Sequence, residues 1–202
     1  MAIPIRKITD FKGQLAGGGS RPNLFEVEMA FPSDVGVDAA TLTQGRFLCK
    51  AANLPASNVA SIDVPFRGRI LKVAGDRTFD VWTVTIINDE NFLLRNAFEA
   101  WMQGISKNSN NTGATEPGSY MTNALVHQLG RGADNGIESQ SNSGLVSGGA
   151  ITPLKTYTFF DIFPTNISAI DLSYDASDTI EEYTVEFQVQ YWEPGSWTKD
   201  QA

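Results

Sequence analysis

The fold is decided by residues 182–192, which read EYTVEFQVQYW. Successive side chains of a β-strand point to opposite faces, so the two-residue period of this segment predicts one strand with an apolar face and a wet face. The apolar face carries Tyr183, Val185, Phe187, Val189 and Tyr191, and the wet face carries Glu182, Thr184, Glu186, Gln188 and Gln190. Such a strand belongs to a sheet that covers a core on one side only.

Other segments show the same period. Residues 24–31 place Glu26 and Glu28 opposite an apolar stripe. Runs rich in Val, Ile, Phe and Thr predict further strands over 46–52, 58–64, 66–73, 78–87, 121–129, 154–163 and 167–174. Within this region, residues 53–78 are expected to form a hairpin whose loop, residues 66–69, presents two cations. About nine strands predict an all-β or β-rich domain.

A single helix is expected after the Asn-Asp pair at 88–89, either residue of which can cap it. Leu94, Phe98, Trp101 and Ile105 recur at helical spacing and form one apolar stripe. We expect this stripe to pack on the sheet and not to hold a cofactor.

Composition excludes several classes of function. The chain has 202 residues, of which 42% are hydrophobic and 19% charged, so it can bury a core. One cysteine, Cys49, and one histidine, His127, leave no internal disulfide and disfavour zinc chemistry. The net charge of −8 has the wrong sign for binding nucleic-acid phosphates. The sequence therefore predicts neither catalysis nor a cofactor.

An acidic segment near residue 175 partly matches a calcium-binding loop. Asp171, Ser173, Asp175 and Glu182 occupy ligand positions of such a loop, but Ala176 stands where the sharp turn needs glycine. An acidic turn is therefore the better interpretation, and no metal is expected.

The chain is expected to form one domain over residues 1–202. Residues 1–21 are interpreted as an N-terminal arm that ends after three glycines. Residues 104–150 are rich in Gly, Ser and Asn and are interpreted as an excursion within the domain. The N-terminus lacks the apolar core of a signal peptide, so assembly in the cytoplasm is expected.

Motifs along nearly the whole chain resemble one protein family. They include VPFRGR at 64–69, VAGDRTF at 73–79 and RNAFEAWM at 95–102. Further matching segments lie at 11–25, 82–85, 88–89, 163–168, 171–175 and 185–192. In this order they resemble the tail tube proteins of T-even-type contractile-tailed phages. Residues 137–150 depart from the family pattern.

The resemblance implies a structural virion protein of the phage tail, assembled in the host cytoplasm. Tubes of this family are stacks of hexameric rings. Each subunit is an antiparallel β-sandwich or split barrel with one flanking α-helix, and it lends four strands to a shared inner β-barrel. The implied partners are further copies of the chain, the tail sheath outside, the baseplate initiator and tail terminator proteins, the tape measure protein inside before ejection, and duplex DNA that passes without specific binding.

The residues agree with this interpretation. Six copies lending four strands each, spaced ~4.8 Å and tilted ~40°, give a backbone diameter of roughly 48 Å, which leaves a bore wider than a DNA duplex. An acidic wall repels phosphates, so the expected lumen-facing residues are Glu26, Glu28, Glu186, Gln188 and Gln190. The expected contacts between rings or subunits are Arg67, Arg69 and Arg77.

Two alternatives remain at this stage. The first is the tube of a contractile injection or secretion system, which shares the fold but moves protein. The second is a β-sandwich carbohydrate-binding module of a virion, for which Trp192 and Trp197 would be the sugar-binding aromatics.

Overall fold

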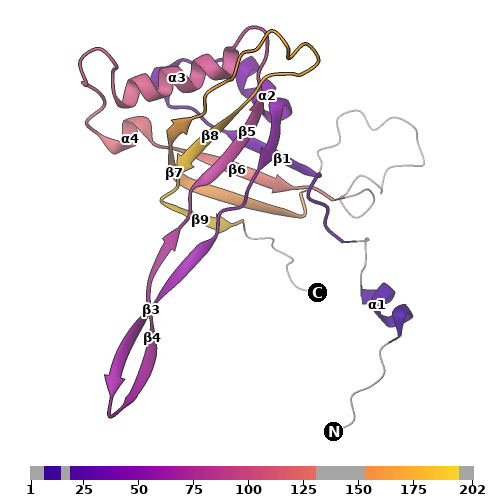
Figure 1. Ribbon diagram of the computed structural model, residues 1–202, viewed down its shortest axis with the longest axis vertical. Coiled ribbons are helices and arrows are strands. Elements are labelled where there is room, and N and C mark those ends of the chain that lie inside the picture. Colours follow the sequence, from indigo (N-terminus) through magenta and orange to yellow (C-terminus); the bar gives the residue numbers. More distant parts are fainter. Residues whose placement is uncertain (1–6, 15–18, 131–152, 196–202) are drawn as a thin grey trace. The chain divides into compact units, whose positions relative to one another are not determined.

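The computed structural model describes residues 7–14, 19–130 and 153–195 (Figure 1). The strands are β1 (Phe25–Met29), β2 (Cys49–Ala52), β3 (Ser57–Phe66), β4 (Arg69–Phe79), β5 (Trp82–Ile87), β6 (Thr122–Gln128), β7 (Lys155–Ile167), β8 (Glu182–Gln188) and β9 (Tyr191–Pro194). The helices are α1 (Ile8–Gln14), the 3-10 helix η2 (Ser33–Val35), α2 (Ala39–Leu48), α3 (Leu93–Ile105) and α4 (Pro117–Tyr120). The antiparallel, strand-rich architecture expected from the sequence is confirmed.

The strands form two sheets. The larger sheet has the order β1-β6-β7-β8-β5-β2, with β9 paired to β7, and the smaller sheet is the β3–β4 hairpin. By compactness the chain divides into a larger unit, Val27–Leu125 with Tyr157–Pro194, and a smaller unit made of the remaining segments. The hairpin, α3 and most of the large sheet belong to the larger unit.

Strand β8 confirms the predicted alternation up to Val189. Tyr183, Val185, Phe187 and Val189 are all buried in the core. Residues 189 and 190 then interrupt the strand, and β9 resumes pairing at Tyr191, opposite Phe160. The interruption shifts the alternation by one residue. Tyr191 is therefore exposed, whereas the indole nitrogen of Trp192 is buried, which corrects the prediction of one regular strand over 182–192.

Helix α3 is the predicted helix, and it packs on the sheet through aromatic rings. Phe187 of β8 lies 5.9 Å from Phe98 and 6.0 Å from Trp101, both on α3. The same ring lies 5.1 Å from Trp82 of β5, which stacks on Phe159. All five side chains are at most 1% exposed. The stripe that the sequence assigned to packing is thus the centre of the core.

The prediction of a strand over 46–52 was wrong for its first half. Residues 39–48 form helix α2, and only Cys49–Ala52 is a strand. The side chain of Asp38 accepts a hydrogen bond from the Thr41 backbone N–H at 2.8 Å and so caps α2. Gly45 lets α2 approach α3, because a Cβ atom there would lie 3.3 Å from the Leu94 side chain.

Two further boundaries differ from the predictions. Residues 78–87 do not form one strand, because β4 ends at Phe79 and β5 begins at Trp82. The segment 167–174 is not a strand beyond Ile167. Residues 171–180 are all exposed and have no core to cover, so their apolar side chains do not indicate a buried face.

The β3–β4 hairpin agrees with the predicted one. Its turn residues, Arg67 and Gly68, have φ angles of 46° and 85°. Positive φ at both positions is typical of the two-residue turns that match the twist of a hairpin. Figure 1 shows the hairpin leaving the large sheet on the side away from α3.

Replacing Phe187 by Ala tests the central position of this ring. We expect the free energy of unfolding to fall by about 3–5 kcal/mol, because the buried ring contacts both helix α3 and Trp82 of β5. The matched control is Gln188→Ala, which truncates the exposed neighbouring residue on the same strand. It should change the free energy of unfolding by less than about 0.5 kcal/mol. Urea unfolding followed by tryptophan fluorescence measures both, and equal losses would contradict this packing.

Candidate functional site

One face of the β3–β4 hairpin is apolar and exposed to solvent. Cross-strand partners share a face, and Val64 pairs with Leu71 while Ile62 pairs with Val73. These side chains are 43%, 62%, 53% and 44% exposed, respectively, and Phe66 at the end of the face is 67% exposed. We call Ile62, Val64, Phe66, Leu71 and Val73 the hairpin apolar face. Such a contiguous exposed apolar surface is unusual for a monomeric protein.

The opposite face of the hairpin is polar over most of its length. Asp63 pairs with Lys72 in register, and the two side chains form an ion pair at 2.8 Å. Ser61 pairs with Ala74 on the same face. The hairpin is therefore amphipathic although neither face covers the core, which indicates that a partner covers the apolar one.

The three arginines predicted to make contacts between subunits lie on this hairpin. Arg67 occupies the turn, where its guanidinium lies 5.4 Å from the Phe66 ring centroid, and Arg69 begins β4. Arg77 lies further along β4, opposite Val59. The structure thus brings Arg67 and Arg69 together at the tip and leaves Arg77 apart from them.

The predicted lumen-facing residues lie on two strands. Glu28 of β1 forms an ion pair with Arg46 of α2 at 2.9 Å, a partner that the sequence did not reveal. Glu186 of β8 alternates with the buried core residues and is half-buried, and Gln188 is exposed. The other two are Glu26, which lies on β1 within the smaller unit, and Gln190, which is exposed in the break between β8 and β9.

The remaining chemical candidates show structural contacts. Burial raises the pKa of the Cys49 thiol to about 12, so this thiol stays protonated and unreactive near neutral pH. A ring nitrogen of His127 lies 2.9 Å from the Thr156 hydroxyl. The Trp192 ring contacts those of Phe79 and Tyr157. These two ring contacts and the buried indole nitrogen indicate a structural role for Trp192, and Trp197 lies outside the described residues.

The described residues contain no group of three or more His, Cys, Asp or Glu side chains placed to hold a metal ion. The acidic residues around Ala176, which partly matched a calcium loop, lie within the described part of the chain and form no such group. Across the described ranges, no helix is both long and apolar enough to span a membrane.

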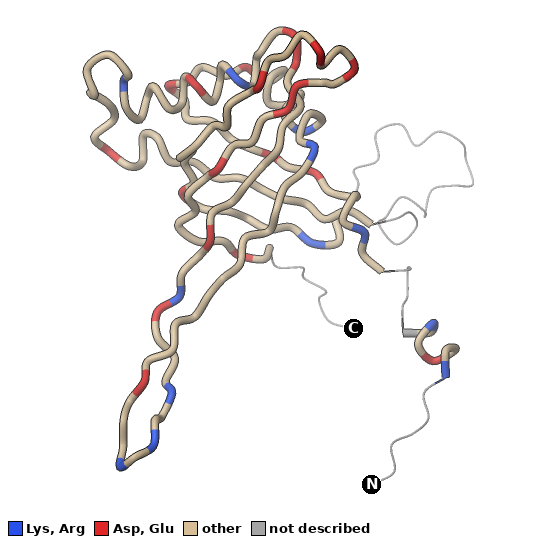
Figure 2. Tube along the Cα trace, viewed as in Figure 1, with Lys and Arg blue, Asp and Glu red and all other residues tan. Residues whose placement is uncertain are grey.

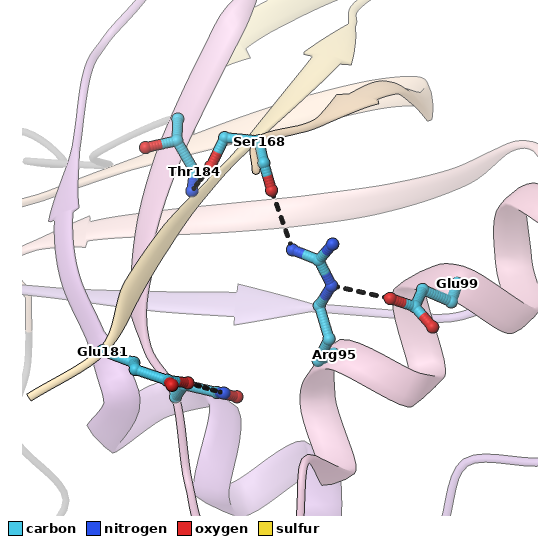
Figure 3. A network of polar contacts seen from close by, with 6 residues as sticks. Arg95, Glu99, Ser168, Glu181 and Thr184 are labelled. Atoms are coloured by element: carbon cyan, nitrogen blue, oxygen red, sulfur yellow. Dashed lines mark hydrogen bonds and ion pairs between the residues drawn. The ribbon is translucent and has the colours of Figure 1, made fainter. Parts of the chain in front are cut away.

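A polar network holds the loop between β7 and β8, residues 168–181, against α3 (Figure 3). Arg95 of α3 donates from Nη1 to the Ser168 carbonyl at 3.0 Å and from Nε to Glu99 at 2.7 Å. The Ser168 hydroxyl oxygen accepts from the Thr184 N–H at 2.9 Å. The Arg95 guanidinium also lies 5.1 Å from the centroid of the Tyr183 ring.

The other end of the loop is held separately. The Asn88 N–H donates to the Glu181 carbonyl, and the Asn88 side-chain amide donates to the Glu181 carboxylate, both at 2.9 Å. Asp89 accepts from the Leu93 N–H at 3.1 Å, but the N-cap residue of α3 is Phe92, which makes no side-chain capping bond, so the predicted cap at 88–89 was wrong. The segment just before α3 therefore contacts both the loop and the first residue of the helix.

Charge is distributed unevenly over the larger unit. Figure 2 shows basic residues at the hairpin tip and acidic residues along the 168–181 loop. Sequence reasoning noted the acidic segment but missed that Leu172, Tyr174 and Ile180 are exposed beside the carboxylates. It also missed the hairpin apolar face, because alternating apolar residues normally indicate a strand that covers a core.

A sequence model of the family described as "Phage tail tube protein" matches residues 20–194. This match spans the large sheet, α3 and the hairpin. The chain belongs to the phage tail tube protein family. It is 34% identical over 179 residues to "Tail tube protein gp19" of Enterobacteria phage T4, a comparison that covers 88% of this chain and 93% of that relative. The resemblance seen in the sequence is thereby confirmed.

Solved structures of contractile injection systems share the fold of this tail tube protein. A chain of the anti-feeding prophage baseplate superposes with a TM-score of 0.55 at 12% identity, covering 96% of this chain and 97% of that one. A chain of the extracellular contractile injection system sheath–tube complex gives a TM-score of 0.52 at 13% identity, covering 90% of this chain and 95% of that one. At such identities the likeness concerns the fold alone.

Arg95→Ala tests the network that holds the loop. Arg95 is only 18% exposed, so we expect the free energy of unfolding to fall by about 1.5–3 kcal/mol and the Thr184 amide to exchange faster with solvent. Arg95→Lys keeps the charge but not the planar donor geometry and should have an intermediate effect. Glu99, 53% exposed, contributes an exposed ion pair, so Glu99→Ala should lose less than about 1 kcal/mol. A larger loss for Glu99→Ala than for Arg95→Ala would contradict this assignment.

Proposed function

We propose that this chain polymerises as stacked hexameric rings into the inner tube of a contractile phage tail, and that phage DNA leaves through the tube. The protein acts by assembly and not by catalysis. Membership of the tail tube family supports the tube. The observation that carries self-assembly is the hairpin apolar face, because its five side chains are exposed in the single chain.

The hairpin suits a contact between copies better than a contact within the chain. Strands of ten and eleven residues extend an apolar face into solvent, and burying such a face is favourable by roughly 25 cal/mol per Å². The hairpin contacts the rest of the larger unit near its base, where the Phe79 ring centroid lies 6.1 Å from that of Trp192 on β9. Its tip is thus free to reach a neighbouring subunit or ring, with Arg67, Arg69 and Arg77 as candidate contacts.

The formation of a ring also needs strands at the edge of the sheet that can pair with a neighbouring copy. Strands β1 and β2 end the path of the large sheet. An open sheet edge presents hydrogen-bonding groups to another chain, and pairing between neighbours removes the edge. We propose that such pairing closes a β-barrel shared by six copies, each lending four strands.

The proposed wall of the bore carries Glu26, Glu28, Glu186, Gln188 and Gln190. The supporting observation is the alternation along β8, since Val185, Phe187 and Val189 are buried and Glu186 and Gln188 alternate with them. A negatively charged wall repels the DNA backbone, which lets the duplex pass without binding.

The proposed partners follow from the arrangement of a contractile tail. They are the sheath outside, the baseplate initiator and the tail terminator at the ends, and the tape measure protein inside before ejection. The structural relatives come from a sheath–tube complex, a baseplate and a tube-terminating cap, which supports partners of these kinds. An injection-system tube remains the alternative on fold alone, and the family match favours the phage tail.

Substituting both Val64 and Leu71 by Thr tests the self-assembly role of the hairpin. Thr keeps the strand propensity, and both positions are exposed, so the subunit should fold with unchanged stability. We expect tube formation to be lost, as seen by negative-stain microscopy and sedimentation. The control is Ser61→Thr with Ala74→Thr, a cross-strand pair on the opposite face, which should assemble normally. Normal tubes from the Val64/Leu71 variant would overturn the proposed role.

Substituting Glu186 and Gln188 by Lys tests the bore. If these residues line the lumen, assembled tubes of the variant should retain duplex DNA at low salt and release it as salt screens the attraction. Tubes of the wild-type protein, and of a variant with Glu186→Gln alone, should not retain it. The assignment is wrong if a reconstruction of the tube places both side chains on its outer surface.

A further inference from the structure

The exposed side chains of the 168–181 loop have the composition of a protein-binding surface. Residues 171–180 are all exposed, and they include three large apolar side chains. Leu172 is 80% exposed, Ile180 is 71% exposed and Tyr174 is fully exposed. A loop of this length in a compact fold commonly has a function, and exposed apolar side chains indicate that something covers it.

Carboxylates surround these apolar side chains. Asp171, Asp175 and Asp178 lie in the same exposed stretch. No ion pair between them and any residue of the described part of the chain is present. The loop therefore presents apolar surface together with unneutralised negative charge.

The loop is presented on a fixed base. Arg95 and Thr184 hold its first residue, Ser168, and Asn88 holds its last residue, Glu181 (Figure 3). The exposed middle is thus displayed from an anchored position, which lowers the entropy cost of binding a partner there.

The hairpin tip has the complementary composition. Phe66 and Ile70 are 67% and 62% exposed, and between them Arg67 lies in the turn and Arg69 begins β4. Figures 1 and 2 show the basic tip and the acidic loop at opposite ends of the larger unit. They therefore cannot meet within one chain, but they can meet between two copies.

We infer that the hairpin tip of one copy binds the 168–181 loop of a second copy. Arg67 and Arg69 pair with the loop carboxylates, and Phe66 and Ile70 pack against its apolar side chains. This inference rests on the proposed self-assembly and adds the surface that receives the hairpin. Because the two surfaces differ, the contact is heterologous and does not make a two-fold dimer; repeated along an axis, it generates a filament.

A groove between α2 and α3 is the alternative binding site for the hairpin tip. It is lined by Val35, Val37, Leu93, Ala97 and Ala100, among others, and has a volume of about 490 Å³. Its lining includes one carboxylate, that of Asp38, which already caps α2 through the Thr41 N–H. The groove therefore accommodates apolar side chains but offers the tip arginines less negative charge than the loop does.

Charge reversal in two separate variants tests the pairing. One variant carries Arg67→Glu and Arg69→Glu, and the other carries Asp171→Lys, Asp175→Lys and Asp178→Lys. All five positions are exposed, so both proteins should fold, which their urea unfolding curves check. We expect each variant alone to form no tubes under conditions where the wild-type protein polymerises. Arg67→Lys with Arg69→Lys keeps the charges and should polymerise.

The decisive sample is an equimolar mixture of the two reversed variants. Each hairpin then meets a loop of opposite charge on the other variant, so we expect tubes that contain both proteins, and high salt should weaken them. If the hairpin variant fails but the loop variant alone forms normal tubes, the loop assignment is wrong while the proposed function stands. If the mixture fails as its components do, the pairing is likewise overturned. Absence of tubes from the wild-type protein under every nucleating condition would instead contradict the proposed function itself.

Discussion

The contact of Phe187 with α3 is the interaction on which the rest of the larger unit depends. It joins the helix stripe, at Phe98 and Trp101, to the sheet at Trp82. With α3 fixed in this way, Arg95 reaches the Ser168 carbonyl and holds the 168–181 loop. The core therefore fixes the position of a loop that contributes nothing to the core itself.

Apolar residues serve two separate purposes in this chain. One set is buried between α3 and the sheet, and it accounts for the stability of the subunit. The other set, on the hairpin and the 168–181 loop, is exposed in the single chain and lies outside its core. The proposed assembly needs both sets, because the subunit must fold and then associate with identical copies through its exposed surfaces.

Local patterns predicted much of the fold. The alternation in β8, the stripe of α3 and the turn at Arg67-Gly68 each follow from contacts within a few residues, and all three are confirmed. Helix α2 was missed because its cap, Asp38, lies upstream of the apolar run that resembled a strand. The break at residues 189–190 was missed because alternation continues through it in the sequence. Whether an alternating strand covers a core or a partner depends on tertiary packing. The exposure of the hairpin apolar face could therefore be recognised only in the structure.

Thiol labelling at the hairpin most directly tests the central claim, which is that a second copy covers the hairpin apolar face in the assembled tube. Val64→Cys places a thiol on the hairpin apolar face, and the native Cys49 gives little background because burial raises its pKa to about 12. Maleimide should react rapidly with this thiol in free subunits and many times more slowly in assembled tubes, since a second copy then covers the face. Equal reaction rates in subunits and tubes would contradict the account.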